Sequence, residues 1–145
     1  MPFMWADTLL AAEGAHLLRL LAWGAASVFV GTALLAWLRV GARRSALLEQ
    51  FALQTAGWGA AEVALATLAR MSLGVRDLAG ATRLDRLLWL NLGLDAGYLM
   101  LGIALAIVGW RLARHVGFVG AGIAIVVQGG ALGLLDLVFA LQISR

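Results

Sequence analysis

Three carboxyl groups lie within segments of this chain that are otherwise apolar enough to cross a membrane. Glu62 is in the second such segment, Asp95 is in the third and Asp136 is in the fourth. Counted inwards from the Arg that flanks each segment, all three lie roughly 12–14 Å deep at the 1.5 Å rise of a helix. Because a charge in hydrocarbon costs several kcal/mol, an acid at this depth is by itself a functional hypothesis.

A layer of three acids could bind, exchange or pass a proton or a cation. Desolvation and repulsion between like charges both disfavour an ionised carboxyl group, so such a layer would keep one or more protons at neutral pH. It would then serve as a coupling or permeation site. Two other interpretations remain open. The acids could belong to interhelical hydrogen bonds that only stabilise a small bundle, or they could bind a polar headgroup or pigment.

Other polar side chains lie on the same helix faces as these acids or on neighbouring faces. In the third segment, Asn91 and Tyr98 fall with Asp95 within an arc of roughly 60°, at about 100° per residue. In the second and fourth segments, a Gln precedes the acid by about two helical turns. Since exposing such groups to lipid is costly, we expect them to face the bundle interior and to hydrogen-bond the acids.

Arg19 bears on whether the layer is a binding site or a structural network. It lies a few residues into the first segment, on the same side as the carboxyl groups. It could reach inwards and neutralise Asp95 or Asp136, or extend to the lipid headgroups, and we expect the second. The candidate ligand- or ion-binding residues are Glu62, Asp95, Asp136, Asn91, Tyr98, Gln128, Gln54 and Arg19.

The elements that must position these residues are long apolar helices. The chain has 145 residues, of which 63% are hydrophobic and only 13% charged, with a mean hydropathy of +0.93. Soluble domains have about a quarter of their residues charged. Helices satisfy their own backbone groups in lipid, and the alternating segments of a β-barrel are absent. We predict a single all-α domain of four transmembrane helices, at about residues 17–40, 46–70, 84–111 and 116–143.

Local signals place the starts of these helices. Ser45 is a plausible N-cap for the second helix, and Thr82 with Asp85 fits a capping box at the start of the third. The beginning of the chain lacks the positive region of a cleavable signal peptide. We expect it to form a short interfacial helix, anchored by Phe3 and Trp5, that runs into the first span.

An even number of spans places both termini on one side of the membrane. The cationic residues, all Arg, are nearly balanced between the two sides, with Arg19 and Arg145 counted on the terminal side. The density of Arg in the short first and third loops favours termini outside. The near-balance also permits insertion in both orientations, as in an antiparallel dimer.

The two halves of the chain look related. Gly31 matches Gly102 at one offset, and Glu62 matches Asp136 at an offset three residues larger. This indicates a helical hairpin repeated twice, with a pseudo-two-fold axis along the membrane normal. Chance similarity in a sequence rich in Ala, Leu and Gly is the alternative.

Glycine residues indicate where helices approach closely. Gly93 with Gly97 and Gly129 with Gly133 form small-xxx-small pairs, which permit tight helix contact. The fourth segment is richest in glycine, so it is either the most central helix or the one that meets a partner. An alternative function follows, that of a non-catalytic accessory subunit of a larger membrane complex, docked through this helix.

Metal, cofactor and enzyme chemistry are not indicated. There is no cysteine, and His16 and His115 lie at opposite faces, about 30 Å apart, so they cannot jointly bind one haem. His16 with Glu13 makes at most a weak metal site. Hydrolase and phosphate-binding motifs are absent, as is a basic stripe with aromatic residues for nucleic acid. We expect no enzyme activity, cofactor, metal or nucleic acid. The expected partners are membrane lipids and a homo-oligomer or larger membrane complex.

The runs LLWLNLGLDAGYLMLG and VVQGGALGLLDLVFA resemble small four-helix bacterial membrane proteins grouped as a family of unknown function. The residues that carry this resemblance, mainly in the second half, are Asn91, Asp95, Gly97, Tyr98, Gln128, Gly129 and Asp136. It implies a four-span protein of a bacterial inner membrane and supplies no activity. Small multidrug exporters and small fluoride channels are similar in size. The former carry a coupling Glu in the first span, and the latter rely on Phe and Asn patterns, and both features are missing here.

Overall fold

The computed structural model describes residues 4–112 and 114–143, and this part of the chain contains helices and no strand. Phe3 and Arg145, on which two sequence predictions rely, lie outside the described residues. The helices are α1 (Met4–Val40), α2 (Ala46–Met71), α3 (Leu78–Ile107), the π-helical turn η1 (Val108–Leu112) that continues α3, and α4 (Val116–Ile143).

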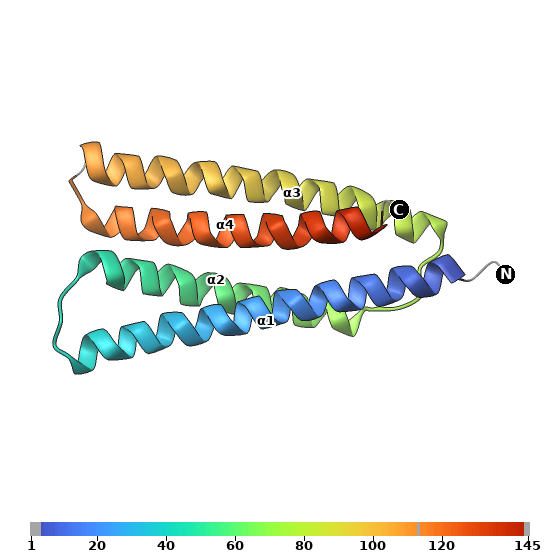
Figure 1. The fold of residues 1–145 in the computed structure, drawn as a ribbon, viewed down its shortest axis with the longest axis horizontal. Coiled ribbons are helices and arrows are strands. Elements are labelled where there is room, and N and C mark those ends of the chain that lie inside the picture. The colour runs from blue at the N-terminus through green and yellow to red at the C-terminus, as the bar shows by residue number, and fades with distance from the viewer. Residues whose placement is uncertain (1–3, 113, 144–145) are drawn as a thin grey trace.

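The helices form two antiparallel hairpins that lie side by side (Figure 1). α1 packs along α2, α3 packs along α4, and α2 packs against α4 between them. The Cα atoms of α2 and α3 stay more than 8 Å apart throughout the described residues. α4 therefore contacts every other helix, whereas α2 and α3 are held apart. The start of α1 and the end of α4 lie at the same end of the molecule, as an even number of long helices requires.

The N-terminal segment is part of α1 rather than a separate helix. α1 has 37 residues, which is about 55 Å at 1.5 Å per residue and exceeds the ~30 Å of a bilayer's hydrocarbon core. No proline or glycine pair between Met4 and Val40 interrupts it. The expected interfacial segment is thus the first turns of one long helix, and Trp5 is exposed there.

Capping residues set the starts of α2 and α3. Ser45 is the N-cap of α2, as predicted, and its hydroxyl accepts a backbone N–H of the first turn at 3.4 Å. For α3 the predicted capping box is wrong. Asp77 is the N-cap and accepts the Gly80 N–H at 2.7 Å, whereas Thr82 lies inside the helix and donates to the Leu78 carbonyl at 2.9 Å. Either residue type caps well, and the earlier one extends the helix by more than a turn.

Small residues bring the two helices of each hairpin together in the same register. A Cβ on Gly31 of α1 would lie 2.6 Å from the Ala52 carbonyl oxygen of α2. A Cβ on Gly102 of α3 would lie 2.8 Å from the Val126 nitrogen of α4. In the predicted repeat, the first offset relates Gly31 to Gly102 and the larger offset relates Ala52 to Val126. The same two positions of the repeat therefore meet in both hairpins. The hairpins therefore share one packing register, which the predicted duplication requires.

The glycine residues of α4 face other helices of the same chain. A Cβ on Gly120 would overlap the Leu47 carbonyl oxygen of α2, and one on Gly122 would lie 2.5 Å from the Gly102 carbonyl oxygen. Of the two sequence interpretations, α4 is thus the central helix. Gly93 and Gly97 of α3 have no neighbouring atom within 4 Å, so this predicted pair makes no tight contact inside the chain.

Among the described residues, three helices are long and apolar enough to cross a membrane. α2 is not one of them, although its 26 residues are sufficient in length. Gln50, Gln54 and Glu62 lower its hydropathy. Where the sequence predicts four spans, length and composition therefore support three, which are Trp5–Val40, Leu78–Leu112 and Val116–Ile143.

Candidate functional site

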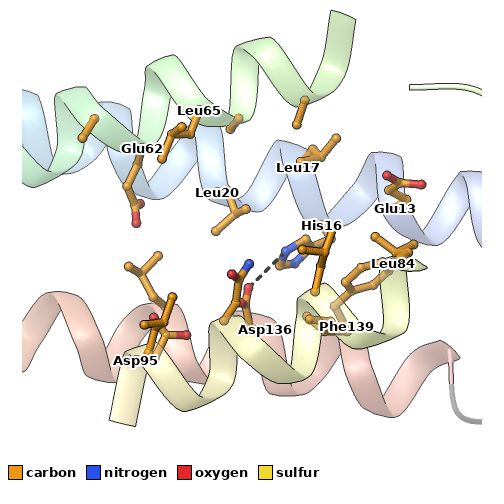
Figure 2. Close-up of a pocket in the computed structure, with 18 of the residues that line it drawn as sticks. Glu13, His16, Leu17, Leu20, Glu62, Leu65, Leu84, Asp95, Asp136 and Phe139 are labelled. Carbon is orange, nitrogen blue, oxygen red and sulfur yellow. Dashed lines mark ion pairs between the residues drawn. The ribbon is translucent and has the colours of Figure 1, made fainter. Parts of the chain in front are cut away.

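The three acidic side chains of the predicted layer lie in one pocket between the hairpins (Figure 2). Its volume is about 470 Å³, and all four long helices contribute to its wall. Only 8% of Glu62 is exposed, and 6% each of Asp95 and Asp136. The predicted convergence of three helices on one buried acidic layer is therefore confirmed, and the role of these side chains as ligand-binding groups stays a prediction.

Two of these carboxyl groups have an oxygen without a partner. Glu62 Oε2 and Asp95 Oδ2 are buried and accept no hydrogen bond from the described residues. Leaving a buried polar atom unpaired costs roughly 1–3 kcal/mol, so such atoms are rare in folded proteins and point to a functional or strained site. Both oxygens are thus available to a proton or a ligand in the pocket.

Asp136 differs from the other two acids because it is paired with His16. His16 Nε2 of α1 lies 3.2 Å from Asp136 Oδ1. The imidazole also stacks on the ring of Phe139, with 4.5 Å between centroids and 11° between planes. His16 is buried, although the sequence places it at one face of the membrane. Its partner could not be predicted, because the pairing depends on α1 lying against the last turns of α4.

A second ion pair lines the end of the pocket nearest the chain termini. Arg76, in the loop between α2 and α3, donates from Nε to Glu13 Oε2 at 2.8 Å and from Nη2 to Oε1 at 2.5 Å. Such bidentate pairs are among the stronger polar contacts in proteins. The hydrogen bonds to Glu13 raise the pKa of Arg76. This contact ties the loop to α1.

Sequence reasoning included neither Glu13 nor His16 in the layer, although a signal was present. The two residues are three positions apart, so they lie on the same face of α1. Both line the pocket with Asp136. A polar pair at this spacing near the end of an apolar helix could have indicated that α1 contributes to the site.

Asn91 and Tyr98 line the pocket, as predicted, but do not hydrogen-bond its acids within the described part of the chain. Asn91 is exposed. Tyr98 instead meets Trp58 of α2, with 4.9 Å between ring centroids and 66° between planes. The two rings connect α2 to α3, which have no close backbone contact.

Gln128 belongs to a separate polar contact. Its amide accepts from Trp23 Nε1 at 2.7 Å and donates to Ser27 Oγ at 3.1 Å, and only 1% of the residue is exposed. Neither Gln128 nor Gln54 lines the pocket. The prediction that these amides hydrogen-bond the acids is wrong, because two helical turns separate each Gln from its acid by about 12 Å along the axis.

Arg19 does not reach the acids. Its Nη1 donates to Gln142 Oε1 at 3.4 Å, in the last turn of α4, and Arg19 does not line the pocket. The structure therefore excludes the alternative in which Arg19 neutralises Asp95 or Asp136, and the expected extension to the lipid headgroups stays a prediction. The C-terminal end of a helix carries partial negative charge, which favours the Arg19 guanidinium group beside the last turn of α4.

Metal-binding geometry is absent from residues 4–112 and 114–143, which contain no group of three or more His, Asp or Glu placed to hold a metal ion. The acids instead lie on different walls of one cavity. His115 lies at the start of α4 and stacks on Phe118, at the opposite end from His16. The arrangement can hold a cation that touches more than one wall, or a proton on one acid.

A family model matches residues 19–137, and its description is that of a family of unknown function, DUF6992. The chain belongs to this family. The DUF6992 match covers parts of both hairpins and includes Glu62, Asp95 and Asp136, whereas the resemblance in the sequence lies mainly in the second half. Glu13 and His16 precede the matched residues. Searches of curated proteins and of solved structures found no match.

Proposed function

We propose that this protein is a small integral membrane protein that binds a proton or another cation in the pocket between its hairpins. The observation that carries the proposal is the pair of buried, unpartnered oxygens, Glu62 Oε2 on α2 and Asp95 Oδ2 on α3. In the bundle, the more polar α2 packs between α1 and α4, two of the three helices that are long and apolar enough to cross a membrane.

The charge of the pocket favours a cation. An ionised carboxyl group in surroundings of low dielectric constant attracts a cation far more strongly than it does in water. Binding also relieves the cost of the unpaired oxygens. A proton and a larger cation would compete for the same atoms, so cation affinity should rise as the pH rises.

The packing favours binding and exchange from one side over a continuous pore. Beyond the acids, towards the 41–45 loop, the hydrogen bond of Gln128 to Trp23 occupies the bundle interior. Still further along, Gly31 packs on α2 and Gly122 packs on Gly102, at backbone contact. The pocket is thus confined to the half of the bundle that contains the start of α1 and the end of α4.

Carbodiimide labelling tests the proposal. Dicyclohexylcarbodiimide is apolar and reacts with protonated carboxyl groups in apolar surroundings. With the protein in lipid nanodiscs at mildly acidic pH, peptide mapping should find the adduct on Glu62 or Asp95. Sodium or tetramethylammonium chloride should slow the labelling if either ion occupies the site. The exposed Glu49 serves as an internal control.

Two variants sharpen this test. Glu62→Gln and Asp95→Asn keep the side-chain shape and should each remove one labelled position. Gln128→Leu changes a buried amide outside the pocket and should leave labelling unchanged. Labelling confined to exposed acids in the native protein would contradict the proposal and favour a purely structural network.

The alternative function as an accessory subunit depends on docking through the glycine residues of α4. Gly117, Gly120 and Gly122 are buried against other parts of this chain, so these three residues are not free for docking to a partner. Purification in mild detergent, with mass identification of everything that co-elutes, would reveal a larger assembly formed through another face.

A further inference from the structure

The pocket opens sideways, between α2 and α3. Three leucine residues line it and are also exposed on the outside of the bundle: Leu65 at 67%, Leu87 at 56% and Leu94 at 47%. Because these leucine side chains face both the pocket and the outside of the bundle, they lie at the mouth of the pocket. Because α2 and α3 have no close backbone contact in the described residues, the mouth lies along their length rather than at a helix end. A ligand would therefore enter through an apolar rim.

Behind this rim the pocket is acidic. Glu62 Oε2 and Asp95 Oδ2 belong to side chains more than nine-tenths buried, and neither has a partner. Figure 2 shows Glu62 pointing from one wall towards the side on which Asp95 and Asp136 lie. Among the described residues, Arg76 is the one Arg that lines the pocket, and it is bound to Glu13. An apolar entrance thus leads to two carboxyl groups that each have an oxygen without a partner among the described residues.

An aromatic pair lies beside these acids. Trp58 and Tyr98 both line the pocket and meet edge to face. Aromatic faces attract organic cations, by about 0.5–1 kcal/mol when exposed and about 2 kcal/mol when desolvated. Inorganic cations of group II prefer shells of several oxygen atoms, and no such cluster of acids occurs in the described chain. Aromatic rings with carboxylates match a substituted ammonium group better.

We infer that the ligand of the proposed cation site is an amphipathic organic cation, a substituted ammonium group on a hydrocarbon body. The inference rests on the proposed function and names its ligand class. The nitrogen lies between Glu62 and Asp95 beside the aromatic pair, and the hydrocarbon passes between Leu65 and Leu94 to the lipid. The volume of about 470 Å³ is within the usual range for small-molecule sites, about 300–1,000 Å³.

Radiolabelled dodecyltrimethylammonium is the probe, with the full chain in uncharged dodecyl maltoside micelles and a scintillation proximity readout. The native protein should bind it saturably. The Glu62→Gln/Asp95→Asn double variant should lose at least tenfold in affinity, and Trp58→Leu should lose several-fold. Gln128→Leu should bind as the native protein does, which separates loss of the site from loss of the fold.

The mouth provides a second, milder variant. Leu65→Trp changes an exposed residue that lines the pocket and should weaken binding by narrowing the entrance. Leu68→Trp changes a residue of similar exposure on α2, 62%, that does not line the pocket, and it should have no effect. Equal binding by both variants and by the double acid variant would overturn the inference.

Competition identifies the ligand chemistry and its source. Dodecanol, which has the same chain and no charge, should not compete, and tetramethylammonium should compete weakly because it lacks the hydrocarbon. Competition by phosphatidylcholine would assign the ammonium group to a lipid headgroup, and its failure would assign it to a free amine. If sodium protects Glu62 and Asp95 from carbodiimide but dodecyltrimethylammonium does not, the cation site stands and this inference fails.

Discussion

His16 and Asp136 join the first helix to the last across the inner wall of the pocket, with 3.2 Å between Nε2 and Oδ1. Phe139, one turn after Asp136 on α4, stacks on the imidazole and holds its plane. A salt bridge and a ring contact therefore act on the same side chain from the same helix face. This contact determines how α1 lies on the second hairpin near the site.

The first prediction concerns this pair. His16→Ala or Asp136→Ala leaves the other group buried without its partner, at a cost of roughly 1–3 kcal/mol. The double variant should lose less than the sum of the two, with a coupling of about 0.5–3 kcal/mol. Thermal unfolding of the four proteins in detergent measures it. Strictly additive losses would show that the contact contributes nothing of its own.

The second prediction concerns the contact between α2 and α4. Gly120→Ala places a methyl group on the Leu47 carbonyl oxygen, so the helices must separate, at a cost of about 1–3 kcal/mol. Gly93→Ala is the matched control, since no atom lies within 4 Å of its added Cβ. The unfolding temperature should fall for the first variant and stay or rise for the second. The opposite order would contradict the packing described here.

The third prediction separates the buried amide from the pocket. Gln128→Leu deprives Trp23 Nε1 and Ser27 Oγ of their partner, which should cost about 1–3 kcal/mol. The emission of Trp23 should change as its indole loses the hydrogen bond, best measured against Trp23→Phe. Carbodiimide labelling of Glu62 should not change. A parallel loss of labelling would mean that amide and acids act as one network.

The fourth prediction concerns the loop between α2 and α3. Glu13→Gln removes the charge that holds Arg76 in its bidentate contact, so trypsin should cleave after Arg76 several-fold faster. Asp7→Asn changes an exposed acid on the same helix and should leave the cleavage rate unchanged.

The same contact has a defined pH dependence on its basic side. Because Glu13 raises the pKa of Arg76, the stabilisation is fully present below the usual pKa of arginine and is lost as the pH rises from there through the raised value. Protection from trypsin in the native protein should therefore persist across the alkaline range in which the enzyme works. Loss of protection in mild alkali would show that the ion pair does not hold the loop.

The acidic layer could be predicted because it depends on properties local to each helix. Apolar runs define the helices, and the rise per residue converts the position of Glu62, Asp95 or Asp136 into a depth. The cost of an acid in apolar surroundings then directs each side chain inwards. The same reasoning failed for Gln54 and Gln128, since lying on neighbouring faces of one helix does not place two residues at one depth.

Only the tertiary structure decided which residues meet within that layer. The contacts of His16 with Asp136, of Glu13 with Arg76 and of Trp58 with Tyr98 join different elements. These contacts depend on the rotation of each helix about its axis and on which helices are neighbours. The close backbone contacts at glycine positions together determine both. Apolar helices pack in several orders at similar energy, so pattern and composition predict a buried acid but not its neighbours.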